Sequence, residues 1–248
     1  MNLSEIRSKA RESLKGKWTK VVVIALIQAA IIYGAQLISN LLGGFLTLAV
    51  TICAVPIEFG LYISYMKIFK NEEVDYTDFL KDGFKNFGRA WGIVGNTLLK
   101  MWPLILGYVV SLIIFVFSVI LVVIGATTSE TIFLTIGTVL VILSVVGLYV
   151  SLIWMIIRGL LYSLSYYIAI DNPEITTKQA VQESEKLMKG NRGKLFLLNL
   201  SFIGWGILAI LTIGIGSLWL LPYMIFSEII FYQMLKSQTE KIEVISEK

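Results

Sequence analysis

Long apolar stretches separated by short basic segments form the main pattern of this chain. All of the 21 Lys and Arg residues except Arg158 lie in the basic segments, and each apolar stretch has room for two helices. A helix needs about 20 apolar residues to cross about 30 Å of hydrocarbon. The pattern therefore predicts an all-α polytopic membrane protein with six transmembrane helices. The basic segments are 1–20, 67–100, 178–194 and 236–248, and the expected crossings lie near 19–41, 46–69, 103–125, 131–157, 195–213 and 217–236.

The positions of the basic residues also predict an orientation. The breaks inside the apolar stretches carry no Lys or Arg. Short loops rich in Lys and Arg stay on the cytoplasmic side of a membrane during insertion. We therefore expect both termini to be cytoplasmic and the helices to form three hairpins, each entering from the cytoplasm. Residues 1–248 are expected to form a single integral membrane domain.

A short amphipathic helix is expected before each hairpin. Apolar residues recur at helical spacing in the segments 3–18, 76–91 and 180–188. A helix with an apolar face opposite a charged face suits the headgroup region of a bilayer. We interpret these three as cytoplasmic interfacial helices, either for lipid sensing and partner docking or for simple anchoring. The recurrence suggests repeat units of about 1–70, 71–170 and 171–248 around a possible pseudo-threefold axis.

The fourth apolar stretch is longer than one crossing needs. From Thr131 to Asp171 the only charged side chain before Asp171 is that of Arg158. Either the helix ends near Arg158 and an interfacial helix follows through Tyr166 and Tyr167, or one long helix is tilted.

One stripe of small residues leads toward the third crossing. Gly88, Gly92 and Gly95 are spaced so that another helix could approach closely on that side.

Composition narrows the possible chemistry. Apolar residues make up 56% of the chain, mean hydropathy is +0.79 and the formal net charge is +4. The basic residues follow the ends of the spans and form no separate domain, so we expect anionic lipid headgroups as partners and no nucleic acid. The chain has no His and one cysteine, Cys53, which excludes the usual zinc, copper and haem ligand sets and Ser-His or Cys-His catalytic pairs. We therefore expect no cofactor, no metal and no enzymatic activity.

Three ionisable side chains lie inside the apolar segments: Glu58, Arg158 and Glu228. A charge at such depth costs about 2.5–3.5 kcal/mol on insertion scales, so it usually faces protein, water or an opposite charge. The three occupy equivalent positions in the proposed repeat and would meet in one polar cluster around a pseudo-threefold axis. The cluster would be either an ion pair that fixes helix packing or a site for an ion, a proton or a polar headgroup. Neutral partners could come from Gln28, Gln36, Asn96 and Asn199.

The third unit is similar to a known family. The residues that carry the resemblance are Asp171-Asn172-Pro173-Glu174, Ala180, Ser184, Met188 to Asn191, Leu195-Phe196, Leu200 to Trp205, Gly214 to Gly216 and Pro222-Tyr223, with Arg7, Ala10, Arg11, Leu14, Gly16 and Trp18 near the N-terminus. They resemble the DUF975 family of bacterial integral membrane proteins, a family of unknown function. The resemblance implies a bacterial cytoplasmic (inner) membrane protein and brings no catalytic residues with it.

The same residues suggest candidate sites for docking a lipid or a protein. Asp171 and Asn172 form one group, and Lys189, Asn191 and Arg192 form another. Trp91, at the end of the second amphipathic segment, is a further interfacial candidate. A structural interpretation also fits, with a helix-stopping turn at Asp171 and a capped helix exit at Gly190.

Two functions remain open. The first is a non-enzymatic membrane protein that acts in cell-envelope homeostasis through lipid or protein partners. The alternative is a small secondary transporter or permease for an ion or a small amphiphile that uses the Glu58, Arg158 and Glu228 cluster. Internal repeats, which transporter folds often contain, favour the alternative.

Overall fold

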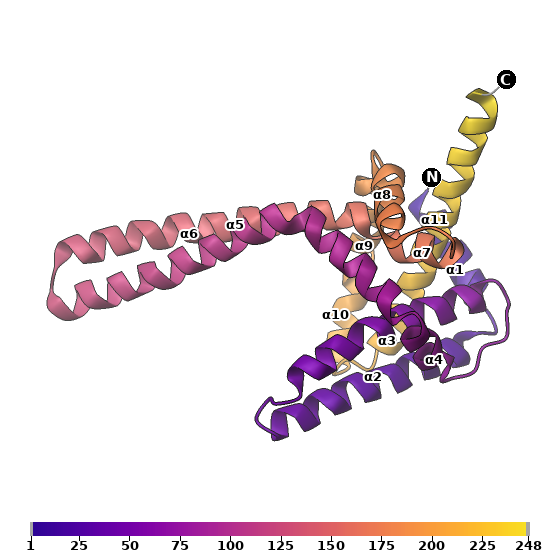
Figure 1. Cartoon of the computed structure of the whole chain (residues 1–248), viewed down its shortest axis with the longest axis horizontal. Coiled ribbons are helices and arrows are strands. Elements are labelled where there is room, and N and C mark those ends of the chain that lie inside the picture. Colours follow the sequence, from indigo (N-terminus) through magenta and orange to yellow (C-terminus); the bar gives the residue numbers. More distant parts are fainter. Residues whose placement is uncertain (1, 247–248) are drawn as a thin grey trace. The chain divides into compact units, whose positions relative to one another are not determined.

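The computed structural model describes residues 2–246, with side chains described as far as Glu240. This part of the chain contains eleven α-helices and no strand, as the hydrophobic pattern predicts (Figure 1). The helices are α1 (Leu3–Leu14), α2 (Trp18–Leu41), α3 (Thr47–Phe69), α4 (Asp78–Lys85), α5 (Phe87–Thr128), α6 (Thr131–Tyr162), α7 (Ser165–Asp171), α8 (Thr177–Met188), α9 (Arg192–Leu200), α10 (Ile203–Leu211) and α11 (Ser217–Ser246).

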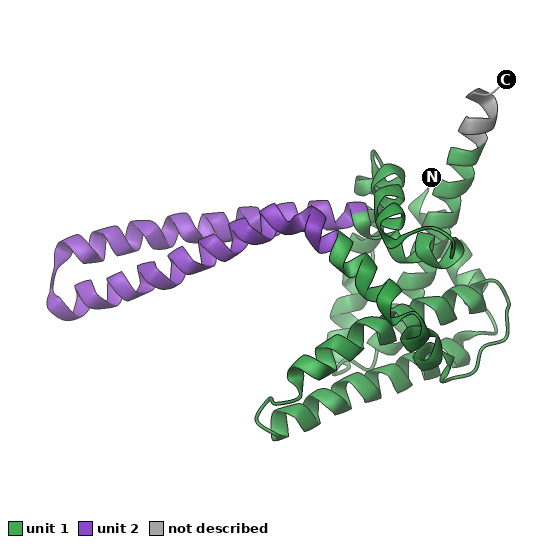
Figure 2. Cartoon of the chain, viewed as in Figure 1, with its two compact units in different colours: residues 1–96, 162–248 green, residues 97–161 purple. Residues whose placement is uncertain are grey.

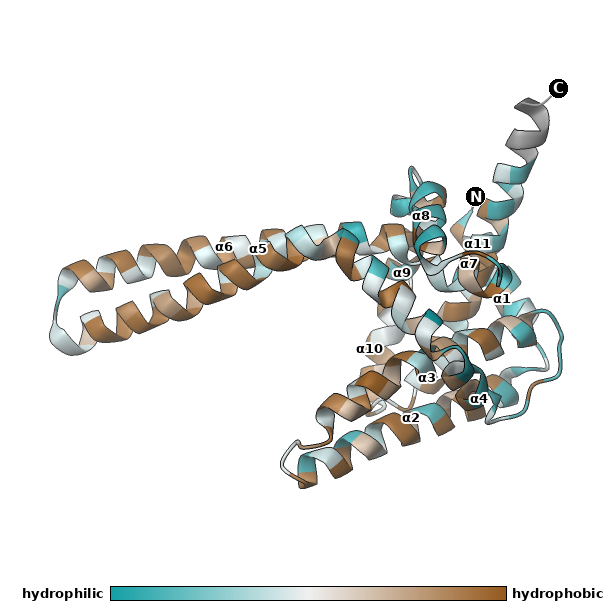
Figure 3. Ribbon diagram, in the orientation of Figure 1, coloured by the Kyte–Doolittle hydropathy of each residue, from teal (hydrophilic) through white to brown (hydrophobic). Residues whose placement is uncertain are grey.

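Six helical segments are long and apolar enough to cross a membrane, which confirms the expected number of spans. Figure 3 shows apolar residues along nearly the whole length of α5 and α6. Large apolar side chains there are exposed, among them Leu99, Ile113 and Leu143. Such surfaces are stable when lipid, and not water, is the solvent. The spans are Trp18–Leu41, Thr47–Phe69, Phe87–Thr128, Thr131–Asp171, Arg192–Leu211 and Ser217–Glu240.

Some helix boundaries differ from those expected from the sequence. The second amphipathic segment is divided at Asn86, whose side-chain amide donates to the carbonyl of Asp82 (2.8 Å) and ends α4. The helix of the third crossing, α5, starts at Phe87 and is continuous to Thr128. Helix α6 continues past Arg158 to Tyr162, and a separate short helix, α7, follows. This matches the first arrangement expected for the fourth crossing, with a helix end soon after Arg158 and a second helix through Tyr166 and Tyr167.

The chain forms two compact units (Figure 2). The first consists of residues 1–96 and 162–248, and the second of residues 97–161. In the second unit α5 and α6 lie side by side, and a Cβ atom added at Gly147 would lie 2.7 Å from the hydroxyl oxygen of Ser111. The threefold division of the chain into repeats stays a prediction.

In the first unit the helices of the three segments expected to be amphipathic pack on other helices of the chain. Helix α1 packs on α11 and buries Ile6, Ala10 and Leu14. Helix α4 packs on α3 and buries Phe79, and α8 packs on α7. Their apolar faces are therefore at least partly used within the protein. Their location at a membrane surface stays a prediction, as does the side from which each pair of spans enters.

Two glycines allow the close approach of α3 and α4. A Cβ atom added at Gly60 would overlap the carbonyl oxygen of Phe79 and would lie 2.8 Å from the backbone nitrogen of Gly83. A Cβ atom added at Gly83 would overlap the carbonyl group of Pro56. The backbones of the two helices are thus in contact, which fixes the position of the charged residues that follow on each helix.

Candidate functional site

The two embedded carboxylates lie in the first unit, on neighbouring spans. Glu228 of α11 accepts a hydrogen bond from the Tyr167 hydroxyl (2.8 Å) and another from the side chain of Asn199. The Oδ1 atom of Asn199 is buried without a hydrogen-bond partner among the described residues. A carboxylate in a spanning helix is stabilised by such donors, because lipid supplies none.

Tyrosine rings connect this carboxylate with Glu58 of α3. Tyr62 packs edge-on against Tyr166 and Tyr167, with ring centroids 5.3 and 5.4 Å apart. The Glu58 carboxylate is close enough to Tyr62 and Tyr166 to act on them electrostatically, but it is exposed and forms no hydrogen bond or ion pair with the described residues. The Glu228 carboxylate lies near Tyr62 and bonds to Tyr167. The structure thus brings both carboxylates to one group of side chains. We call it the tyrosine–carboxylate cluster; it consists of Glu58, Tyr62, Tyr166, Tyr167, Asn199 and Glu228.

Arg158 lies on α6 in the second unit, and its side chain is exposed. Its meeting with Glu58 and Glu228 stays a prediction. The partners that the sequence analysis missed are the three tyrosines. For Tyr166 and Tyr167 the available signal was the Tyr-rich segment 162–167, which was interpreted as an aromatic belt at the membrane surface; no such signal marked Tyr62.

The Asp171 side chain, at the end of α7, links α7 to α11 and to the residue that follows α3. These contacts lie at the basic ends of the spans. The Asp171 carboxylate accepts hydrogen bonds from Lys236 (2.6 Å), Lys70 (3.0 Å) and the Tyr232 hydroxyl (3.1 Å). The Asp171 side chain is only 11% exposed, whereas the two lysines are more open to solvent. We call this group the Asp171 junction. Its geometry favours a structural role for Asp171.

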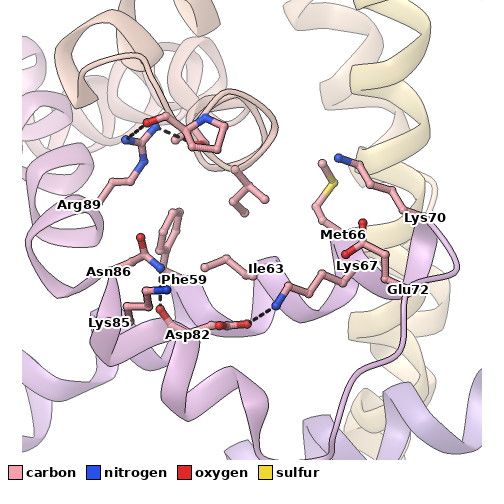
Figure 4. Close-up of a pocket in the computed structure, with 13 residues that line it drawn as sticks. Phe59, Ile63, Met66, Lys67, Lys70, Glu72, Asp82, Lys85, Asn86 and Arg89 are labelled. Atoms are coloured by element: carbon pink, nitrogen blue, oxygen red, sulfur yellow. Dashed lines mark hydrogen bonds and ion pairs between the residues drawn. The ribbon is translucent and has the colours of Figure 1, made fainter.

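A basic cavity of about 330 Å³ lies beside this junction, between α3, α4, the first turn of α5 and α7 (Figure 4). Its wall combines three kinds of side chain. The apolar part of the wall includes Phe59, Ile63 and Met66, the basic part consists of Lys67, Lys70, Lys85 and Arg89, and the acidic part consists of Glu72 and Asp82. Basic residues thus outnumber acidic ones in the wall.

The four basic residues differ in how their charge is compensated. Lys67 forms an ion pair with Asp82 (2.7 Å), visible in Figure 4, and Lys70 belongs to the Asp171 junction. Arg89 donates only to backbone carbonyls at the end of α7 and just beyond it, those of Ala169, Asn172 and Pro173, each at 2.9 Å. Lys85 is exposed and forms no ion pair or hydrogen bond with the described residues. Arg89 and Lys85 therefore present positive charge that no acid neutralises.

A comparison with protein families shows to which family the chain belongs. The model of DUF975, described as a protein of unknown function, matches residues 1–239. The chain belongs to the DUF975 family. No curated protein and no solved structure matches it.

The remaining candidate docking residues of this DUF975 protein are distributed over the first unit. Trp91 donates from its indole nitrogen to the carbonyl of Ile52 (3.1 Å), which joins α5 to α3. Asn191 donates to the carbonyl of Leu187 (3.1 Å) and accepts from Lys194 (3.0 Å). Lys189 is exposed and Arg192 is partly exposed. Asn172 contributes its carbonyl to Arg89. The docking roles stay predictions. The side chains of Asn172, Lys189 and Arg192 form no hydrogen bond or ion pair with the described residues.

No site for a metal is found among the described residues: no three or more Asp, Glu or Cys side chains gather in a way that could hold an ion. The DUF975 chain thus presents two groups of polar side chains with distinct chemistry. The tyrosine–carboxylate cluster can exchange protons or contact a cation. The basic cavity can receive an anion that carries an apolar part.

Proposed function

We propose that this DUF975 protein is a non-enzymatic, multi-pass protein of the bacterial cytoplasmic membrane that recognises anionic phospholipid headgroups through the basic cavity. Its N-terminus and C-terminus are cytoplasmic, so the cavity faces the inner leaflet. In this role the protein contributes to cell-envelope homeostasis, alone or with a membrane-protein partner. The observation that carries the proposal is the pair of uncompensated basic side chains, Lys85 and Arg89, beside an apolar wall.

The wall of the basic cavity suits a phospholipid at the membrane surface. The Lys85 ammonium is exposed and can contact a phosphate. Phe59 and Ile63, in the apolar part of the wall, are only 1% and 8% exposed, so a lipid would be contacted mainly through its headgroup. The Arg89 guanidinium is held in a fixed position by three carbonyls, so it supplies positive potential without having to be reordered on binding. A Lys or Arg near an anionic bilayer surface contributes about 1 kcal/mol of attraction.

Lipid binding by the purified protein tests this proposal. Native mass spectrometry in detergent, with phosphatidylglycerol or phosphatidylcholine of the same acyl chains, gives the affinity for each. We expect phosphatidylglycerol to bind more tightly, and the variant Lys85→Gln to reduce that preference about fivefold, which corresponds to about 1 kcal/mol. Lys81→Gln is the matched control, because Lys81 lies on the same helix but outside the cavity wall.

Two results of the lipid-binding experiment would contradict the proposal. Equal binding of the two lipids by the unmodified protein contradicts the proposal. So does an equal effect of Lys81→Gln and Lys85→Gln, because then general surface charge accounts for the preference.

The tyrosine–carboxylate cluster supports a second candidate function, transport of an ion or a small amphiphile. Glu228 lies in a candidate spanning segment and is held by Tyr167 and Asn199; the Oδ1 atom of Asn199 has no hydrogen-bond partner among residues 2–240. Flux measured in proteoliposomes with a pH-sensitive dye tests this function. A proton flux that is lost in Glu228→Gln and retained in Glu130→Gln would favour it, and no flux above that of empty liposomes would rule out proton transport.

A further inference from the structure

A second cavity, of about 640 Å³, lies between α1, α10 and α11 in the first unit. It shares no residue with the basic cavity. Two arginines of α1, Arg7 and Arg11, contribute to its wall, together with an aromatic group made of Trp18, Trp205, Trp219 and Tyr223. We call it the arginine–tryptophan cavity. Its volume lies in the range typical of ligand sites, about 300–1,000 Å³.

The packing of α1 determines which way its arginines face. Ile6, Ala10 and Leu14 are completely buried on one side of the helix. The Tyr223 hydroxyl donates to the carbonyl of Arg7 (3.3 Å) and ties α1 to α11. Arg7 and Arg11 are four residues apart and so lie on one face of the helix. Both therefore reach the cavity from the same side.

Neither arginine is neutralised by an acid. Among the described residues, no carboxylate forms an ion pair with Arg7 or Arg11, whereas Lys9 on the same helix pairs with Glu5 at 2.8 Å. Guanidinium groups bind phosphate and carboxylate through paired hydrogen bonds. Two of them on one cavity wall, without an acid, thus favour an anionic ligand.

The opposite wall is apolar and aromatic. Trp205 and Leu208 of α10 are 59% and 53% exposed, and Trp219 of α11 is 49% exposed. Trp18 and Tyr223 also line the cavity, with ring centroids 6.4 Å apart, and the Tyr223 hydroxyl contacts the backbone of Arg7. Tyr and Trp side chains favour the boundary between headgroups and acyl chains. The cavity wall therefore combines cationic, aromatic and apolar side chains.

We propose that the arginine–tryptophan cavity binds one anionic phospholipid from the surrounding bilayer. Its phosphate lies against Arg7 and Arg11, and an acyl chain lies along Trp205 and Trp219. The bilayer is the source because the apolar wall belongs to spanning segments. This site extends the lipid recognition proposed above, but it does not depend on Lys85 or on the basic cavity.

Quenching of tryptophan fluorescence by brominated acyl chains tests this site. The chain has six tryptophans, and three of them contribute to the cavity wall. The substitutions Trp91→Phe, Trp102→Phe and Trp154→Phe leave those three as reporters. In nanodiscs of phosphatidylcholine, a small fraction of brominated phosphatidylglycerol should quench them at about one tenth of the mole fraction that brominated phosphatidylcholine requires.

Variants of α1 separate a specific site from general charge. The double variant Arg7→Gln/Arg11→Gln should bring the two lipids to nearly equal quenching, and Arg7→Lys/Arg11→Lys should retain most of the preference. Lys9→Gln is the matched control, because it removes one charge from α1 outside the cavity wall. The melting temperature of each variant, measured in parallel, shows whether it is folded.

The possible results distinguish this proposal from the proposed function. Quenching in Lys85→Gln should be unchanged, so the two sites can succeed or fail separately. Equal quenching by the two brominated lipids in the unmodified protein overturns the proposal, as does a loss of preference in Lys9→Gln as large as in the arginine variant. Quenching by a brominated fatty acid at a lower mole fraction than by brominated phosphatidylglycerol also overturns the proposal, because the occupant would then not be a phospholipid.

Discussion

The contact between α3 and α4 predicts a large effect of one methyl group. In Gly60→Ala the new Cβ atom would overlap the Phe79 carbonyl oxygen and lie 2.8 Å from the Gly83 nitrogen, against a normal separation of about 3.5 Å or more. The atoms in its way are backbone atoms, which cannot move aside by changing rotamer. Helix α4 would therefore have to shift as a body.

The cost follows from what holds α4 in place. Phe79 is completely buried, and Asp82 pairs with Lys67 on α3 at 2.7 Å. Inserting a methyl group into a well-packed interface costs about 1–3 kcal/mol, and a backbone clash belongs at the upper end. Ala is favoured over Gly inside a helix by about 1 kcal/mol. The net loss should be about 2 kcal/mol, or roughly 4–8 °C in the melting temperature of a chain of this size.

Thermal unfolding of the purified protein in detergent, followed by intrinsic fluorescence, measures this loss. Gly95→Ala is the matched control, because Gly95 lies inside α5 and a Cβ atom there has no neighbour within 4 Å. It should leave the melting temperature unchanged or raise it slightly. The reasoning is wrong if Gly60→Ala melts with the unmodified protein, or if Gly95→Ala lowers the melting temperature as much.

Three further predictions concern polar contacts. Tyr167→Phe removes a 2.8 Å hydrogen bond to Glu228 and should lower the free energy of unfolding by about 1.5–3 kcal/mol. In the Glu228→Gln background the same substitution should cost less. Equal costs in the two backgrounds would show that the hydroxyl does not act through Glu228. Asp171→Asn leaves Lys70 and Lys236 without their acid and should lower the free energy of unfolding by about 1–2 kcal/mol, since both lysines are partly solvated. The control Asp75→Asn, at an exposed carboxylate, should lower it by less than about 0.5 kcal/mol in the same melting assay. The backbone N–H of Asp75 holds the pKa of Asp78 below its usual value, so the stabilisation is present above the unfolded pKa of about 3.9 and is lost as pH falls through the lower folded value. The difference in stability between Asp78→Asn and the unmodified protein should be below about 1 kcal/mol at pH 7 and should shrink toward pH 3. A difference that stays constant with pH would contradict this origin.

The number and approximate ends of the spans could be predicted because they depend on composition along the chain. Helix α2 begins and ends within one residue of the expected segment, and so does α3. Hydropathy does not mark where a helix continues beyond the apolar region. For that reason the sequence pattern did not show that α5 extends back to Phe87, and it left open whether α6 continues past Arg158.

Close helix contacts were harder to predict than spans. Of the stripe Gly88, Gly92 and Gly95, only Gly92 lies against a neighbour, with Thr177 2.9 Å from an added Cβ atom. The tighter contact is at Gly60 and Gly83, on two helices joined by a loop. Spacing along one helix shows that a glycine is on a given face, but a close contact also needs a second helix at that face, and the sequence of one helix does not contain that information.

The partners of the charged residues inside the spans were also hard to predict, because they come from other helices. Equivalent positions in a repeat predict that Glu58, Arg158 and Glu228 meet, and depth in the membrane predicts polar partners for them. Glu228 has such partners in Tyr167 and Asn199, whereas Glu58 is exposed and forms no hydrogen bond or ion pair with the described residues. Which partners Glu228 has depends on a break in the chain after Tyr162, where the backbone N–H of Leu164 donates to the Ser184 hydroxyl of α8 (3.2 Å). Helix α7 follows this break, and its Tyr166 and Tyr167 belong to the tyrosine–carboxylate cluster. A phenol satisfies a carboxylate without a second buried charge, so Glu228 needs no arginine to be stable in its spanning segment.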